Sequence, residues 1–303
     1  MIRYLADEEK YLSETLYREA FPEDKDEFVK YYYSYVTKNN KILVMEQAGE
    51  VCSMLHLNPY RLSVNKALVD AYYYVAVATK VRCRHQGMMR SLLHRSLNDI
   101  HKEGHPFTYL MPANRAIYEP FGFRIVYEQK KVELPLDAEE ANEKMSELFD
   151  VYTLRDDWYV EKMLEEERVC AGDPPFEIIP YIMARITHVE NMLELLRSEK
   201  PVSIVLQVED EIIAENRGQF LWEISREGSI CKKIAPEALG FNLEKDEALE
   251  LKSKPSSTKE TKENLKVISV DIAELTEFVF GKRKIEGLEA VKTLSRICIN
   301  EAV

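Results

Sequence analysis

The sequence lacks the features of a membrane or secreted protein. It contains no uninterrupted apolar run of roughly 18 residues, the length that a membrane span requires. Its start, MIRYLADEEKYLSE, has neither the basic end nor the apolar core of a secretion signal. We therefore expect a soluble, cytoplasmic protein that does not act in a membrane.

Metal-binding and disulfide patterns are also missing. The 5 cysteines are widely spaced without a CxxC pair, and the 6 histidines share no ligand spacing with cysteines or carboxylates. We expect neither a metal site nor a disulfide framework. The thiols are predicted to be reduced and mostly buried.

Positive charge is in short supply. The chain has 41 Lys and Arg residues against 53 Asp and Glu residues, which gives a net charge of -12. Such a surface repels nucleic acid phosphates and attracts a small cationic molecule. Solubility alone is an alternative reason for an acidic composition. We expect no nucleic acid partner.

The residues present predict an α/β (α+β) protein of two domains. At 303 residues with 46% hydrophobic content, the chain can bury one large core or two modest ones. Strand-like and helical patterns in residues 1–135 predict a mixed sheet with helices on its faces. Residues 136–175 read as an acidic helical linker, and residues 176–303 as a smaller α+β domain. Helices are expected within that domain at 188–198, 271–280 and 286–297.

One strand-to-helix turn stands out within the first domain. Residues 70–79, DAYYYVAVAT, are rich in β-branched and aromatic residues and predict a strand. Apolar residues then recur at helical spacing until Gly104, at Met89, Leu93, Leu97 and Ile100. Arg84–Met89, RHQGMM, therefore lies at the entrance of a helix that follows a strand.

A helix entrance suits an anion such as a phosphate, because its first N–H groups lack partners and the helix dipole is positive there. Gly87 would let the backbone approach that anion, and Arg84 would add charge. The alternative is an ordinary turn, in which Gly87 serves only its backbone geometry and Arg84 is solvated.

The ordered set VAVAT, RHQGMM, YLMPAN and IYEPFGF resembles the GCN5-related N-acetyltransferase (GNAT) family over residues 1 to about 135. The resemblance implies acetyl-coenzyme A (acetyl-CoA) as cosubstrate, without a metal. It places residues of the strand at the thioester, namely Val77, Ala78 and Thr79. It places the loop around the pyrophosphate, namely Arg84, His85, Gln86, Gly87, Met88 and Met89. His85 and Met89 stand where the family usually has Gly or Ala.

A narrower resemblance covers the whole chain. FTYLMPANRAIYEPFGF, YIMARITHVENML and the ending RICINEAV look like the enhanced intracellular survival (Eis) type of acetyltransferase, which carries a sterol carrier protein-like domain at its C-terminus. Longer members insert a second acetyltransferase-like domain. Only about 40 residues separate Leu134 from Phe176, too few for that unit, so the chain resembles a shortened relative.

The resemblance also implies roles for three residues near the reaction. Tyr118 would protonate the leaving thiol, Asn114 would hydrogen-bond the pantetheine, and the terminal carboxylate of Val303 would act as base. Each has a structural alternative. Tyr118 could close the core beside Phe121 and Phe123, Asn114 could cap a helix, and Val303 could end a frayed terminus.

These observations predict an N-acetyltransferase that moves acetyl from acetyl-CoA to a primary amine of a small cationic acceptor by direct attack in a ternary complex. A homo-oligomer is compatible with this prediction. Two alternatives stay open: a non-catalytic acyl-CoA-binding or regulatory protein of the same fold, and a lipid-binding module within residues 176–303.

Overall fold

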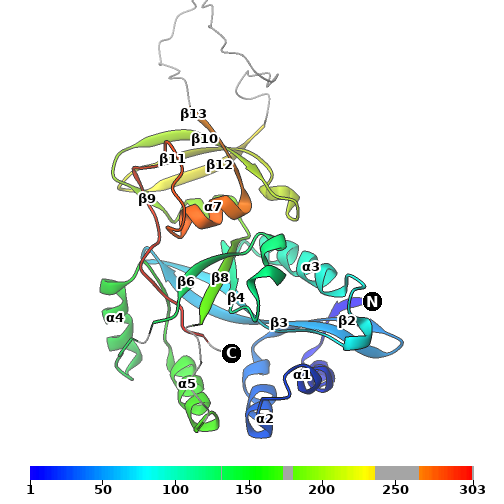
Figure 1. Cartoon of the computed structure of the whole chain (residues 1–303). Coiled ribbons are helices and arrows are strands. Elements are labelled where there is room, and N and C mark those ends of the chain that lie inside the picture. Colours follow the sequence, from blue (N-terminus) through cyan, green and yellow to red (C-terminus); the bar gives the residue numbers. More distant parts are fainter. Residues whose placement is uncertain (131, 173–179, 236–265, 302–303) are drawn as a thin grey trace, which may run out of the picture.

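The computed structural model describes residues 1–130, 132–172, 180–235 and 266–301 (Figure 1). Its strands are β1 Ile2–Tyr4, β2 Lys41–Gln47, β3 Glu50–Val64, β4 Ala67–Thr79, β5 Phe107–Leu110, β6 Arg124–Glu128, β7 Val151–Thr153, β8 Tyr181–Ile186, β9 Arg197–Ser198, β10 Val202–Glu209, β11 Gly218–Ile224, β12 Ser229–Ile234, β13 Lys266–Asp271, β14 Val291–Lys292 and β15 Ile297–Cys298. Its α-helices are α1 Glu14–Ala20, α2 Asp26–Ser34, α3 Met88–Lys102, α4 Ala138–Leu148, α5 Asp157–Val169, α6 Val189–Leu193 and α7 Ile272–Val279.

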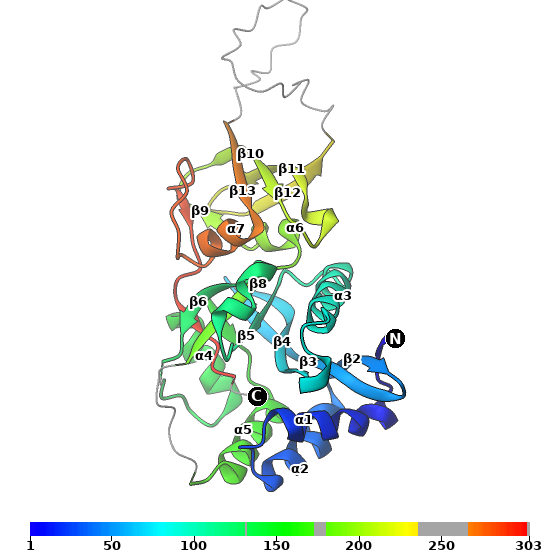
Figure 2. The ribbon, with the colours of Figure 1, turned by 45° about the vertical axis from the view of Figure 1, so that its right-hand side comes forward.

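A large mixed sheet forms the body of the molecule, which confirms the predicted mixed sheet and α/β class. Its order is β1-β2-β3-β4-β5-β8-β6. Strands β1 to β4 pair antiparallel in sequence, β4 and β5 pair parallel, and β8 pairs antiparallel with both β5 and β6. Helix α3 covers one face, and α1, α2 and α5 lie on the other (Figure 2).

The large sheet draws strands from all three predicted ranges of the chain. Strand β8, from the third range, lies between β5 and β6. Strand β7, from the predicted linker, pairs with β3 and with β15. A strand in each of these places satisfies backbone groups that would otherwise be exposed at an edge. The sheet is continuous across the ranges 1–135, 136–175 and 176–303. The division of the chain into these three domain units stays a prediction.

A second sheet, of order β12-β11-β10-β13, lies beyond α7 (Figure 1). One hydrophobic core joins the two sheets through α6 and α7, and Phe107 of β5 meets Phe280 after α7 with ring centroids 5.4 Å apart. A fully buried ion pair, Arg185 to Asp210 at 2.7 Å, also connects β8 of the large sheet to the turn after β10. The two sheets therefore share their interior.

The helix predicted at 286–297 is wrong. Leu288, Val291, Leu294 and Ile297 recur every third residue, a spacing that fits a helix, and all four are buried. The chain instead forms turns at 286–290 and then the short strands β14 and β15, in which Val291 pairs with Ser198 and Ile297 pairs with Val151. Backbone pairing with distant strands replaces the local bonds of a helix, an override that local propensity cannot anticipate.

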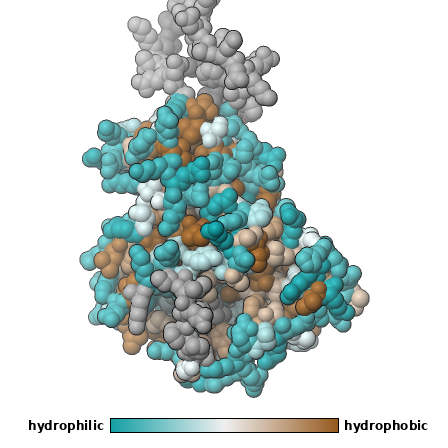
Figure 3. Space-filling model, viewed as in Figure 1, coloured by the Kyte–Doolittle hydropathy of each residue, from teal (hydrophilic) through white to brown (hydrophobic). Residues whose placement is uncertain are grey.

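The surface and the thiols agree with the composition. Figure 3 shows hydrophilic residues over most of one face, with hydrophobic residues in separate patches. The 5 cysteines form no disulfide within the described residues, and every one except the half-buried Cys170 is buried. Among the described helices, none is long and apolar enough to cross a membrane.

Candidate functional site

Strands β4 and β5 separate after a short parallel contact. They pair at Tyr73 with Tyr109 and at Tyr74 with Leu110. Beyond Tyr74, the described residues of β4 pair with β3 alone, through contacts such as Ser53 to Thr79. The N–H and C=O groups on the other edge of β4 therefore have no strand partner there. Such an edge can bind an extended molecule by main-chain hydrogen bonds.

A β-bulge lies where the strands separate. The register shifts between Met54 and His56 of β3, so that two residues of β4 oppose one. Ala76 has φ 51°, a left-handed conformation that is uncommon for a residue other than Gly. A bulge changes the direction of the backbone groups beside it. Of the predicted thioester residues, Val77 lies in this bulge with Ala76, and Ala78 and Thr79 follow it directly.

The predicted loop leads from β4 into α3. A 3-10 turn spans Val81–Cys83, and α3 begins at Met88 after Gly87, whose φ is 75°. No side chain caps the helix, and a Cβ added to Gly87 would meet nothing within 4 Å. Arg84, His85 and Gln86 are exposed. The first N–H groups of α3 therefore face open space, as an anion site requires.

Several cations surround this loop. Lys80 pairs with Glu50 at 3.1 Å, and Arg82 pairs with the same carboxylate. The Arg84 Nε donates to the Thr79 carbonyl at 3.2 Å. Arg90, which the sequence analysis missed, lies in the first turn of α3 with its guanidinium 5.4 Å from the Phe121 ring centroid. Arg90 could have been identified from the sequence, because it is a cationic residue that directly follows the predicted loop.

Tyr118 lies close to two predicted cofactor-binding residues. It is 8% exposed and belongs to a hydrophobic cluster against which Val77 and Met89 also pack. Its ring meets Phe123 edge-on, with centroids 5.9 Å apart. Burial raises the pKa of Tyr118 to about 12. A proton transfer to a thiolate of pKa about 8.5 is then uphill by about 5 kcal/mol, compared with about 2 kcal/mol for an ordinary Tyr.

The turn that carries Tyr118 is firmly held. Asn114 Oδ1 accepts a hydrogen bond from the Ala116 backbone N–H at 3.0 Å, so the capping role is confirmed and a contact to pantetheine stays a prediction. At the other end, Arg185 Nε donates to the Phe121 carbonyl at 2.7 Å. Gly122, at φ 82°, leaves room for that guanidinium. The two contacts fix the backbone on either side of Tyr118.

Val303 lies outside the described residues, but the chain is described up to Glu301. The Tyr127 hydroxyl donates to Asn300 Oδ1 at 3.0 Å, and Gln129 Nε2 donates to the Glu301 carbonyl oxygen at 3.3 Å. Both partners lie on or just after β6. The end of the chain is therefore held against the large sheet as far as Glu301.

The sequence analysis missed a buried polar group at this end. The Glu301 cluster consists of Tyr109 of β5, Thr153 of β7, Tyr159 of α5 and Glu301. The Tyr159 hydroxyl donates to Glu301 Oε1 at 3.5 Å. Burial raises the pKa of Glu301. No sequence motif could have indicated the cluster, because its members come from four separate segments.

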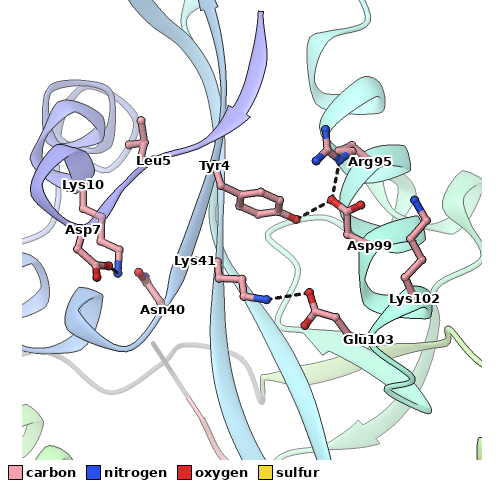
Figure 4. A pocket seen from close by; sticks show the side chains of 10 residues that line it. All are labelled: Tyr4, Leu5, Asp7, Lys10, Asn40, Lys41, Arg95, Asp99, Lys102 and Glu103. Atoms are coloured by element: carbon pink, nitrogen blue, oxygen red, sulfur yellow. Dashed lines mark hydrogen bonds and ion pairs between the residues drawn. The ribbon is translucent and has the colours of Figure 1, made fainter.

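A charged cavity of about 550 Å³ lies elsewhere, between β1 and the C-terminal half of α3 (Figure 4). Tyr4 and Arg95 both bond Asp99, and Lys41 pairs with Glu103 at 2.7 Å. Its carboxylates are thus already paired. None of the predicted site residues lines it. We assign it no part in the site, and no metal-binding group of His, Cys, Asp or Glu occurs among the described residues.

Comparison with known proteins gives a family match for the first part of the chain. Residues 1–126 match the family model of the acetyltransferase (GNAT) domain. No curated protein sequence matches the chain.

Similar solved structures extend over nearly the whole chain. They include a probable N-acyltransferase of Enterococcus faecalis V583 (13% identity, TM-score 0.69, covering 99% of this chain and 97% of that one). Two further similar structures are a GCN5-related N-acetyltransferase of Anabaena variabilis, at 12% identity, and Eis1 of Mycobacterium abscessus, at 14% identity. Each has a TM-score of 0.61, and each match covers 97% of this chain and 94% of the other chain. At these identities the likeness shows the fold alone. The family match covers residues 1–126, where the chain has an acetyltransferase domain of the GNAT type, and it supports an acyltransferase.

Proposed function

We propose that the protein is an N-acetyltransferase that moves acetyl from acetyl-CoA to a primary amine of a small cationic acceptor, by direct attack in a ternary complex. The observation that carries this proposal is the separation of β4 and β5 beside the uncapped start of α3. Free backbone groups along β4 suit the pantetheine arm, and the loop at Arg84–Met89 suits the pyrophosphate.

The chain offers groups for each proton transfer. An alkyl amine of pKa about 10.4 is neutral only about once in 2,500 at pH 7, so attack on the thioester carbon needs a base. In our proposal the Val303 carboxylate takes the proton from the attacking nitrogen. As the carbon–sulfur bond breaks, the Tyr118 hydroxyl gives its proton to the thiolate. The high pKa of Tyr118 means that this transfer depends on the charge that develops on sulfur.

The deciding experiment measures thiol release from acetyl-CoA against a panel of amines that includes polyamines and aminoglycosides. Release that depends on one class of amine, with the acetylated amine found by mass spectrometry, supports the proposal. Acetyl-CoA binding without release for every amine would instead favour the non-catalytic acyl-CoA-binding alternative.

A separate proposal concerns a lipid-binding role of the C-terminal part of the chain. The sheet β12-β11-β10-β13 packs with α6 and α7, and a sterol carrier protein-like fold for this part rests on the resemblance in the sequence. A cytoplasmic location rests instead on the lack of a membrane-length apolar run. Fatty acid or sterol that copurifies with the full chain would favour a lipid-binding role for this part. Its absence from purified protein would count against that role.

A further inference from the structure

Two cysteines lie together at the base of the loop at Arg84–Met89. Cys52 belongs to β3, and Cys83 belongs to the 3-10 turn that leads into the loop. Both pack in one small cluster with Met88, the first residue of α3. They are 2% and 4% exposed, and both thiols are free. The cluster therefore joins β3, the turn and the start of α3 through sulfur-containing side chains.

Backbone hydrogen bonds hold the two cysteines next to each other. The Lys80 N–H donates to the Cys52 carbonyl at 2.9 Å, and the Cys83 N–H donates to the Lys80 carbonyl at 2.8 Å. Burial, and after it a hydrogen bond with the Cys83 thiol, raises the pKa of Cys52. The two thiols are thus in side-chain contact, as a disulfide requires. The remaining cysteines pack in three other clusters, namely Cys170, Cys231 and Cys298.

The two thiols are held with different firmness. Cys52 lies in a strand that pairs with β2 on one side and with β4 on the other. Cys83 lies in a turn of three residues, Val81–Cys83, and the residues directly before and after it, Arg82 and Arg84, are exposed. Short exposed segments open locally at a lower free energy than central strands. Cys83 is therefore the thiol that a small reagent in solution can reach when the turn opens.

Positive charge lies beside the pair. Lys80 and Arg82 each act to lower the pKa of Cys52, although burial has the larger effect. Cations near a thiol favour the thiolate, which is the reactive form, whereas burial in apolar surroundings makes a thiol inert. Opening of the turn relieves the burial and keeps the cations close. We therefore expect reaction through the opened turn.

We infer that Cys52 and Cys83 form a reversible disulfide when hydrogen peroxide oxidises them, and that this bond weakens the binding of acetyl-CoA. The Cys83 sulfur attacks one oxygen of the peroxide, the O–O bond breaks, and a sulfenic acid and one water form. The Cys52 sulfur then attacks the sulfur of that sulfenic acid, the S–O bond breaks, and a second water leaves with the Cys52 proton. Two thiols are oxidised, and one peroxide is reduced to two waters.

The new bond should move the turn and leave the strand in place. A covalent bond brings two sulfur atoms closer than a non-bonded contact does. Because β3 is fixed between two neighbouring strands, Cys83 is the residue that shifts. It is followed directly by the loop, whose N–H groups before α3 are the place that we propose for the pyrophosphate. The effect on acetyl-CoA rests on the proposed function, whereas disulfide formation does not.

Peptide mass spectrometry on the full chain tests the disulfide, after treatment with hydrogen peroxide and alkylation of the remaining thiols. We expect a peptide pair linked through Cys52 and Cys83, which dithiothreitol separates again. Cys83→Ser and, independently, Cys52→Ala should abolish the link. Cys231→Ser changes a buried cysteine of another cluster and is the matched control, which should keep the link.

Calorimetry with acetyl-CoA tests the consequence, because this ligand has no free thiol that could reduce the disulfide. Oxidation should weaken binding at least about fivefold, the effect of losing one hydrogen bond to the pyrophosphate. Dithiothreitol should restore the affinity. Cys83→Ser, if folded by circular dichroism, should bind acetyl-CoA equally well with and without peroxide treatment.

Two outcomes would overturn the inference. If peroxide oxidises the half-buried Cys170 and leaves Cys52 and Cys83 unlinked, the pair has no redox role. If the link forms and acetyl-CoA affinity stays the same, the disulfide does not act on the loop. The proposed function fails separately. A link that forms in a protein without any affinity for acetyl-CoA would remove that function and keep the disulfide, and amine-dependent thiol release without a link would do the reverse.

Discussion

The loop at Arg84–Met89 and the Glu301 cluster lie near the same splayed strands and are built in opposite ways. Arg84, His85, Gln86 and Gly87 of the loop are exposed, its parts are neighbours in the sequence, and the anion site that we propose there depends on backbone N–H groups. The cluster is buried, comes from four segments, and depends on side-chain oxygens. A site made of backbone groups tolerates unusual side chains such as His85. A buried carboxylate is destabilised when any of its hydrogen-bonding neighbours is removed.

Tyr118 packs in the same hydrophobic cluster as Val77 and Met89, and removal of its hydroxyl should have the largest effect. Tyr118→Phe keeps the ring against Phe123 and removes the proton donor. General acid catalysis contributes about 10² to 10⁴, so turnover should fall by that factor in steady-state assays. Acetyl-CoA affinity, measured by calorimetry, should not change. An equal loss of turnover and affinity would mean that Tyr118 serves only packing.

Extension of the C-terminus should also remove activity, by at least about 10²-fold if Val303 supplies the base. Two or three added residues convert the terminal carboxylate into an amide, while the bonds of Asn300 and Glu301 to the β6 side of the sheet can persist. Thermal stability should therefore stay the same.

The matched control for that extension is an equal extension at Met1, which is 76% exposed. It should be tolerated. Equal turnover of the two extended forms, at matched stability and acetyl-CoA affinity, would exclude a catalytic role for the terminal carboxylate and leave water or an internal carboxylate as base.

Gly87→Val tests the loop. The new side chain meets no protein atom, so it should project into the space where we place the pyrophosphate, and acetyl-CoA binding should weaken by about 2 kcal/mol or about 30-fold. Gly172→Val is the control, because Gly172 has a similar φ of 82° and equally open surroundings at the end of α5. It should lose similar stability and no affinity. Unchanged affinity in folded Gly87→Val would show that the loop is only a turn.

The smallest expected effect is the pH dependence of stability at Glu301. Burial raises the pKa of Glu301 in the folded protein above its ordinary value of about 4.3. The contribution of Glu301 to stability is therefore present below about pH 4.3 and is lost as the pH rises through the raised pKa. The groups facing Glu301 are Thr153, Tyr159, Lys162 and Glu166.

Glu301→Gln removes this titration. Relative to the original protein, the variant should gain stability as the pH rises from 4 to 7 in urea unfolding experiments. Glu286→Gln, at an exposed side chain, should differ in stability from the original protein by an amount that does not vary with pH. A constant difference for Glu301→Gln as well would mean that the Glu301 carboxyl is not perturbed, and the contrast between the buried cluster and the exposed loop would weaken.

Local sequence was enough to predict the loop and its strand. The β-branched run, the turn at Arg84–Gly87 and the helical spacing from Met89 lie within one continuous stretch, and β4 and α3 follow that prediction. Tyr118 was predicted from the resemblance of a short motif after β5 to the family, with burial beside Phe121 and Phe123 as the alternative. Its raised pKa could not be predicted, because it depends on what packs around the ring.

Tertiary structure alone decided the rest. Strand β8 enters the large sheet between two strands that precede it by more than 50 residues. Residues 286–297 form turns and short strand pairings despite a helical pattern. The Glu301 cluster exists only because these two choices bring β5, β7, α5 and the end of the chain together. Sequence patterns report short-range periodicity and turn chemistry, whereas long-range pairing is settled by burial and hydrogen bonding of the whole chain.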